Sequence, residues 1–215
     1  MKQVFGLLFV FALSFQVSAS DRKKIMGDAQ ARLAASGISE KARKKGSQYI
    51  NFTLPDANGK NVSISELLKK SAVVLNFYRG GWCPYCNQQL AEYQARISEI
   101  SSAGGQLVAV SPEKPSSAQD TVTKSDLEFA VLSDSHNKVA RQYGLVFKIE
   151  NDLKDVYLKM GLDLEKNQGN NSWELPLPAT YVISKSGEIV YSFVEVDYKK
   201  RASVDDVVEA LKALK

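Results

Sequence analysis

The stretch that decides the fold spans residues 72–93 and reads AVVLNFYRGGWCPYCNQQLAEY. Its first seven residues are mostly apolar and rich in β-branched and aromatic types, which predicts a buried strand. Two glycines follow the strand. Pro84 then suits the first position of a helix, where its missing N–H costs nothing. This order places Cys83 at the N-cap of the predicted helix and Cys86 in its first turn.

Cys83 and Cys86 are the only two cysteines in the chain. The unpaired N–H groups and the positive end of the dipole at a helix N-terminus favour a thiolate over a thiol. A spacing of three places both sulfurs on one face of the helix, close enough to form a disulfide. A strand, a glycine turn and a Cys-Pro-x-Cys helix start therefore predict a redox-active dithiol.

Three simpler explanations of the cysteine pair stay open. A purely structural disulfide would close a very short loop and stabilise the protein much less than the roughly 3 kcal/mol of longer loops. A zinc site needs four ligands, and the chain has only one histidine to add to its two cysteines. Two inert buried thiols would not need glycines, a proline and a helix start around them. We expect a redox dithiol with no bound cofactor and no metal.

Length and composition indicate one globular domain with an insertion. The formal net charge of +4 is too small to indicate nucleic-acid binding. Residues 4–15 form an apolar stretch after Lys2, and small residues follow at 17–19, which predicts a signal peptide over residues 1–19. We expect a helical extension at 20–48 and a main domain at 49–215. The mature protein would be periplasmic or secreted, with no membrane attachment.

Apolar periodicity predicts strands that alternate with helices between residues 52 and 143. A hairpin at residues 180–194 and a last helix capped by Ser203 follow. We therefore predict an α/β fold with a central mixed sheet flanked by helices on both faces. Residues 146–178 exceed what such a core requires. We expect a helix at 152–160 and then a surface loop, or alternatively a lid that shapes access to Cys83.

The run at residues 77–86 resembles the active-site strand and helix of the thioredoxin superfamily. Its Cys-Pro-Tyr-Cys core is similar to glutaredoxins, and Trp82 before the first cysteine resembles thioredoxins. The wider chain resembles the peroxiredoxins of the alkyl hydroperoxide reductase/thiol-specific antioxidant type. That likeness rests on FTLPDANG at 52–59, VSP at 110–112, LSD at 132–134 and YGL at 143–145. The resemblance covers residues 50–215 and implies a thioredoxin-like fold.

Departures from the peroxiredoxin pattern are as informative as the matches. In that pattern a proline precedes a threonine by four residues, and the peroxidatic cysteine follows three further on. Here Arg79 replaces the proline, Cys83 replaces the threonine, and Cys86 matches the cysteine. Peroxiredoxins also use an arginine near the start of the late strand. Here that arginine is missing, and Pro178 stands near the matching position. The resemblance to thioredoxins implies a cis bond before Pro178, with the proline against the cysteine pair.

The resemblance implies a thiol peroxidase that uses a peroxide substrate and a thioredoxin-like electron donor. The alternative is a thiol-disulfide oxidoreductase acting on protein disulfides. By analogy with thioredoxins Cys83 attacks, whereas by analogy with peroxiredoxins Cys86 does. Cys83, Cys86, Pro178, Trp82 and Arg79 are the expected site residues. A more distant alternative is a thioredoxin-fold copper carrier in which His136 joins the two cysteines.

Overall fold

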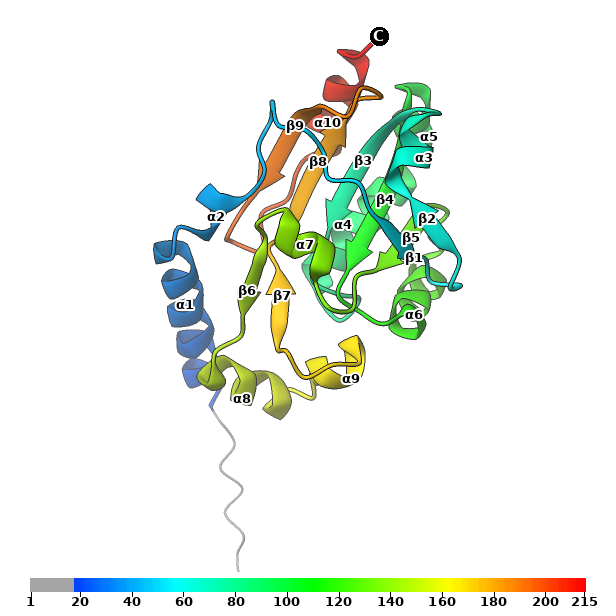
Figure 1. Ribbon diagram of the computed structural model, residues 1–215. Coiled ribbons are helices and arrows are strands. Elements are labelled where there is room, and N and C mark those ends of the chain that lie inside the picture. Colours follow the sequence, from blue (N-terminus) through cyan, green and yellow to red (C-terminus); the bar gives the residue numbers. More distant parts are fainter. Residues whose placement is uncertain (1–17) are drawn as a thin grey trace, which may run out of the picture.

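The computed structural model describes residues 18–215, and its centre is a five-stranded mixed sheet with the order β5-β4-β3-β8-β9 (Figure 1). The strands are β3 (Ala72–Phe77), β4 (Gly105–Ser111), β5 (Ala130–Ser133), β8 (Ala179–Ile183) and β9 (Ile189–Val194). Strand β4 runs parallel to both β3 and β5, whereas β8 runs antiparallel to both β3 and β9. The predicted fold class is confirmed.

Strand β3 lies in the middle of the sheet, and all six of its residues are buried. Side chains alternate between the two faces of a strand. Val74 accordingly packs in one hydrophobic cluster, while Val73 and Leu75 pack in the other. A strand covered on both faces has no polar face, which explains the continuous apolar run in the sequence.

Helices cover both faces of the sheet. One face packs against α4 (Pro84–Ala95), α5 (Ile97–Ser102), α6 (Pro115–Ser125) and α10 (Val204–Lys212). The other packs against α2 (Ile38–Lys41), α3 (Ile64–Leu68) and α7 (Lys138–Gln142). The sequence predicts one helix from Cys83 to about residue 101, and this is wrong at Arg96, where the backbone (φ −118°, ψ 20°) leaves the helical range. Ser203 caps α10 by accepting a hydrogen bond from the Asp206 N–H, as predicted.

A short strand pair and, before it, a helical region precede the central strand. The Asn58-Gly59 pair predicts a reversal between two strands. Strands β1 (Thr53–Pro55) and β2 (Asn61–Ser63) form this antiparallel pair.

Upstream, the stripe of Ile25, Ala29 and Leu33 predicts a single helix over residues 21–45. The chain instead forms α1 (Ala19–Ala35) and α2, separated by Gly37 with a φ of +66°. The predicted signal peptide lies almost wholly outside the described residues. Between residues 18 and 215, none of the helices has the length and apolar character needed to cross a membrane.

The insertion forms a small substructure of its own. It contains β6 (Val146–Lys148), α8 (Asn151–Lys159), α9 (Leu164–Gln168) and β7 (Glu174–Pro176). The predicted helix at 152–160 is confirmed as α8, but the rest is not the expected loop, because β7 pairs with β6 and α9 lies between. A third hydrophobic cluster includes Tyr157, Leu164 and Trp173, and Trp82 of the main domain packs against it.

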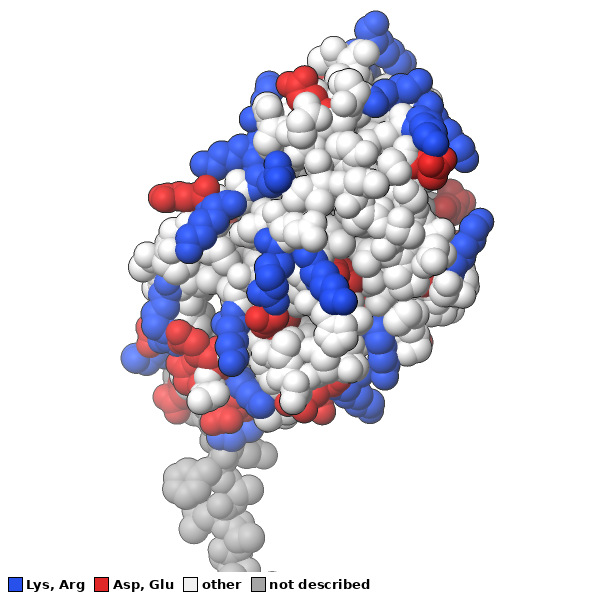
Figure 2. Space-filling model, viewed as in Figure 1, with Lys and Arg blue, Asp and Glu red and all other residues white. Residues whose placement is uncertain are grey.

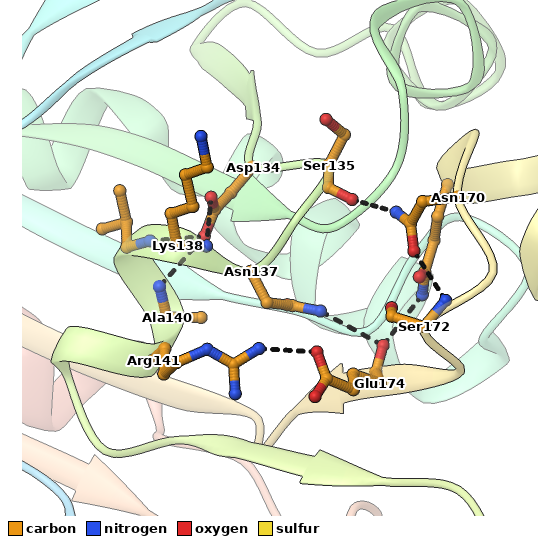
Figure 3. Close-up of polar contacts among 11 residues, drawn as sticks. Asp134, Ser135, Asn137, Lys138, Ala140, Arg141, Asn170, Ser172 and Glu174 are labelled. Atoms are coloured by element: carbon orange, nitrogen blue, oxygen red, sulfur yellow. Dashed lines mark hydrogen bonds and ion pairs between the residues drawn. The ribbon is translucent and has the colours of Figure 1, made fainter.

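Polar contacts fasten the far end of the insertion to α7 (Figure 3). The Asn137 side chain donates to the Glu174 carbonyl, and Arg141 pairs with the Glu174 carboxylate at 2.6 Å. Asn170 donates to the Ser135 carbonyl. Asp134 accepts three backbone N–H groups of α7 and so holds the start of that helix. This end of the insertion is therefore anchored, while α8 lies beside α1 (Figure 1).

Candidate redox site

The turn between β3 and α4 is built so closely that only glycines fit. Gly80 has a φ of +142°, and a Cβ there would lie 2.9 Å from the Glu113 carboxylate and against the Trp82 indole. A Cβ on Gly81 would collide with the Thr121 hydroxyl. The N–H of Gly81 donates to the Glu113 carboxylate at 2.9 Å. The turn therefore packs closely against Thr121 of α6 and is hydrogen-bonded to Glu113, which lies in the segment that follows β4.

Cys83 occupies the N-cap of α4, and Pro84 is the first residue of the helix, as predicted. The Cys83 carbonyl accepts the N–H groups of Cys86 and Asn87, both at 3.0 Å, and these bonds begin the helix. Both cysteines are free thiols and are buried, with 1% of Cys83 and none of Cys86 exposed. Both cysteine side chains are therefore covered by the surrounding protein.

The two sulfurs differ in acidity. Hydrogen bonding from the Cys86 thiol lowers the pKa of Cys83 to about 6, against an opposing effect of burial, and the positive charges of Arg79 and Arg201 act in the same direction. Burial and the neighbouring Cys83 sulfur raise the pKa of Cys86 well above its usual range. These opposite directions favour ionisation of Cys83 before that of Cys86.

Arg201 was missed by the sequence analysis. It lies in the segment between β9 and α10, and its Nη2 is 3.4 Å from the Cys86 sulfur. In sequence it is only the end of a Lys-Lys-Arg run, more than a hundred residues from the cysteines. A run of exposed lysines gives no signal that its last member turns inward, so only the folded chain could identify it.

Arg79 is the second guanidinium at the site, and aromatic rings enclose it. Only 5% of the residue is exposed. Its guanidinium carbon lies 4.9 Å from the Trp82 ring centre and 4.6 Å from that of Tyr198. Its Nη2 also donates to the Tyr157 hydroxyl of α8. The insertion therefore helps to hold Arg79 next to the cysteines, through both Tyr157 and the Trp82 contact at 5.9 Å between ring centres.

A buried carboxyl group lies under the same turn. Glu113 is 3% exposed, and burial raises its pKa to about 7 even though the Gly81 N–H opposes this. The group titrates close to neutral pH as a result. Protonation of Glu113 therefore changes the group that accepts the Gly81 N–H in the glycine turn before Trp82 and Cys83.

The prediction of a cis bond before Pro178 is wrong, because residues 18–215 contain no cis peptide bond. The chain passes Pro178 in the trans form and enters β8 directly, with Ala179 already paired to Phe77 of β3. Pro178 lines a cavity together with Arg79 and Tyr157. The thioredoxin-like feature expected at this position is therefore missing, and the proline belongs to the surroundings of Arg79.

His136 is exposed and precedes α7, on the loop that carries Asp134. The copper hypothesis needs this histidine near both thiols. No group of three or more His, Cys, Asp or Glu side chains suited to a metal ion occurs in the part of the chain that the structure describes.

Basic side chains on the face drawn in Figure 2 are scattered and interspersed with acidic ones.

A dithiol at the start of the helix that follows the central strand of this sheet defines a redox protein of thioredoxin-like fold. Comparison with known proteins narrows the class. The chain belongs to the AhpC/TSA family, whose sequence profile matches residues 46–192. The family assignment confirms the predicted resemblance to peroxiredoxins of the alkyl hydroperoxide reductase/thiol-specific antioxidant type.

Curated relatives agree with this assignment. The chloroplastic peroxiredoxin Q of Triticum aestivum is 31% identical over 162 residues, which are 75% of this chain and 64% of that protein. The match thus spans less than two thirds of the wheat protein. Chloroplastic peroxiredoxin Q of Populus jackii is 26% identical over 212 residues, covering 99% of this chain and 83% of that protein.

Solved structures show the same fold. The crystal structure of peroxidoxin BcpB from Mycobacterium tuberculosis has a TM-score of 0.63 at 20% identity, covering 80% of this chain and 98% of that chain. Peroxiredoxin Q from Xanthomonas campestris has a TM-score of 0.58 at 19% identity, covering 75% of this chain and 90% of that chain.

Alkylation of the reduced protein should reveal the low pKa of Cys83. We expect the rate with iodoacetamide to be half-maximal near pH 6 and to reach a plateau above it, because only the thiolate reacts. Arg201→Gln should move this midpoint upward, since it removes a positive charge near both sulfurs. Lys200→Gln is the matched control, because Lys200 is exposed and pairs with Glu195. A wild-type midpoint above pH 8 would contradict the assignment.

Glu113→Gln should change how stability depends on pH. The folded protein keeps the Glu113 proton up to about pH 7, whereas the unfolded chain loses it near its ordinary pKa. Glu113 therefore makes folding less favourable as pH rises through this window, by roughly 3 kcal/mol in total. Urea unfolding at pH 4.5, 6 and 8 should show the glutamine variant gaining stability relative to wild type as pH rises. The exposed Glu128→Gln serves as control, and an offset that stays constant with pH would refute the prediction.

Proposed function

We propose that this protein reduces hydroperoxides with Cys83 as the attacking thiolate and Cys86 as the resolving thiol. The observation that carries the proposal is the asymmetry of the pair, in which Cys83 has a pKa of about 6 while Cys86 stays protonated. A nucleophile must be ionised to attack a peroxide, and a resolving thiol must wait until the first step is complete.

In the first step the Cys83 thiolate attacks the terminal oxygen of the hydroperoxide. A sulfur–oxygen bond forms, the oxygen–oxygen bond breaks, and the departing alkoxide takes a proton and leaves as an alcohol. Cys83 is now a sulfenic acid. The Cys86 sulfur then attacks it, forming a disulfide and releasing water. A thioredoxin-like dithiol donor restores both thiols by exchange and becomes a disulfide itself.

Two guanidinium groups can supply what the family's missing threonine and late arginine would provide. Peroxide cleavage is helped by fixed donors that stabilise the charge on the departing oxygen. Arg79 and Arg201 are the positive groups that act on both sulfurs. The Nε atom of each guanidinium is buried without a hydrogen-bond partner, so the protein leaves one N–H donor of each group unused. Trp82 contributes by stacking on Arg79 and fixing its plane.

Exchange with protein disulfides is the second candidate function. The observation in its favour is that Tyr85, between the two cysteines, is 37% exposed and so offers an apolar contact beside the site. The same low pKa of Cys83 would serve this reaction. The two candidates differ in the oxidant, a small peroxide in one and another protein in the other.

Export remains part of the proposal. Its support is the apolar run at residues 4–15 after Lys2, followed by small residues at 17–19. We propose a periplasmic or secreted protein, in which a donor outside the cytoplasm would have to keep the pair reduced.

Single cysteine variants should separate the two cysteine roles. We expect Cys83→Ser to lose thiol-dependent peroxide turnover completely, because neither the attacking thiolate nor the disulfide can form. Cys86→Ser should still consume one equivalent of peroxide and keep a sulfenic acid on Cys83, detectable by mass spectrometry after dimedone treatment. Peroxide consumption by Cys83→Ser, with a sulfenic acid on Cys86, would reverse the assigned roles.

The same Cys86→Ser variant tests the second candidate. Offered a protein disulfide, it should trap a mixed disulfide through Cys83 if exchange is the natural reaction, because the resolving thiol is gone. Comparing the rates of oxidation of the wild-type dithiol by hydrogen peroxide, cumene hydroperoxide and a protein disulfide identifies the preferred oxidant. A protein disulfide that reacts far faster than either peroxide would overturn the peroxidase assignment.

Fractionation of cells that make the full chain tests export. We expect the protein in the extracytoplasmic fraction with residues 1–19 removed, and N-terminal sequencing should then begin at Ser20. An intact chain in the cytoplasmic fraction would contradict the prediction.

A further inference from the structure

A cavity of about 160 Å³ lies between α1, the insertion and the surroundings of Arg79. From α1 it is lined by Ala29 and Leu33, and from α8 by Leu153 and Tyr157. Arg79 and Pro178 complete it on the side of the main domain. The family profile matches residues 46–192, so α1 forms a wall of the cavity from outside the matched region. The proposed peroxide chemistry uses Arg79 but leaves this cavity unexplained.

The walls decide what the cavity can hold. Side chains from α1 and the insertion make the lining mainly apolar, although Arg32, Lys148 and Glu150 also contribute to it. An engineered apolar cavity of about 150 Å³ in another protein binds benzene. An apolar group of about that size therefore fits here.

Arg79 places a positive charge at the wall of the cavity, which favours a negatively charged ligand. The residue is only 5% exposed, and its Nε has no hydrogen-bond partner. In residues 18–215 it takes part in none of the ion pairs. The carboxylate of Glu150, which also lines the cavity, pairs instead with Arg32 of α1 at 2.6 Å. The Cys83 thiolate offsets the charge of Arg79 in part. None of the carboxylates in residues 18–215, however, pairs with the planar fork of donors of Arg79, whose geometry matches a carboxylate.

We propose that this cavity binds a small apolar carboxylate, with its apolar group among Ala29, Leu33 and Leu153 and its carboxylate paired with Arg79. The ligand combines the two properties that the walls demand, an apolar body of about benzene's size and one negative charge. A neutral molecule of the same shape would not form an ion pair with Arg79. A smaller anion would leave the apolar walls unfilled.

A ligand bound in the cavity should also change the ionisation of Cys83. Arg79 is one of the positive groups next to Cys83, so a carboxylate that shares its charge would make the Cys83 thiolate less favourable. The ligand would then slow reactions of Cys83. This second statement rests on the proposed role of Cys83, whereas binding itself does not.

Binding is tested by calorimetric titration of the reduced, full-length protein with benzoate. We expect one saturable site. Benzamide, which has the same shape without the charge, and acetate, which has the charge without the ring, should each bind at least tenfold more weakly. No binding of benzoate, or equal binding of benzamide, would overturn the proposal.

Substitutions on α1 locate the site. Ala29→Phe should fill the cavity and weaken benzoate binding at least tenfold. Ala31→Phe is the matched control, because Ala31 is exposed on the same helix, and it should bind like wild type. Leu153→Ala should enlarge the cavity and improve binding of 2-naphthoate relative to benzoate, which a general loss of structure would not do. Unchanged benzoate binding in Ala29→Phe together with no gain in Leu153→Ala would place any benzoate elsewhere and overturn the proposal.

The link to the thiols is measured without peroxide. Saturating benzoate should slow alkylation of Cys83 by iodoacetamide at pH 6 at least threefold, and benzamide should not. An unchanged rate with bound benzoate would overturn the coupling to Cys83 and leave the binding site standing. Conversely, a protein that binds benzoate but never reduces peroxide would refute the proposed peroxidase function alone.

Discussion

The site depends on keeping a negative charge stable where almost no water reaches it. Cys83 is 1% exposed, and an isolated thiolate at that depth would be strongly unfavourable. Three features offset the cost: the hydrogen bond from Cys86, the N-terminus of α4, and the charges of Arg79 and Arg201. Cys86 and the helix N-terminus both belong to α4, and Arg79 lies just before it, whereas Arg201 comes from a distant part of the chain. The position of the thiolate therefore requires the whole domain to be folded, because Arg201 lies beyond β9.

The same requirement gives the added segments of this chain a physical role. A buried guanidinium needs partners as much as a thiolate does. Trp82 and Tyr198 stack on Arg79, and Tyr157 of the insertion accepts its hydrogen bond. The small hydrophobic cluster of the insertion positions Tyr157, and contacts with α7 hold the cluster in place. The insertion is thus a support for Arg79 first, and any effect on access to Cys83 follows from that.

Much of this architecture could be predicted from the sequence because it depends on local patterns. The apolar run at 72–77, the glycines and Pro84 predict the strand, the turn and the helix start, and all three occur where expected. Partners distant in sequence could not be predicted in this way. Arg201 and Glu113 reach the site only through the packing of the sheet, and nothing in their local sequence marks them. Pro178 was misjudged because a resemblance to thioredoxins carries no information about the peptide bond in this chain.

The substitutions that distinguish this chain from the peroxiredoxin pattern act together. Placing a cysteine at the threonine position puts the second sulfur within the first turn of α4, one turn away from Cys86. Two sulfurs this close can form the disulfide without unfolding of the helix. The same substitution, however, removes the hydrogen-bond donor that the threonine would provide. Replacing the proline by Arg79 returns donors and a positive charge to the same place. The two changes therefore compensate each other chemically, since the arginine lowers the pKa of the cysteine that the other change introduced. On this basis we propose that the attacking role passes from the position of Cys86 to that of Cys83.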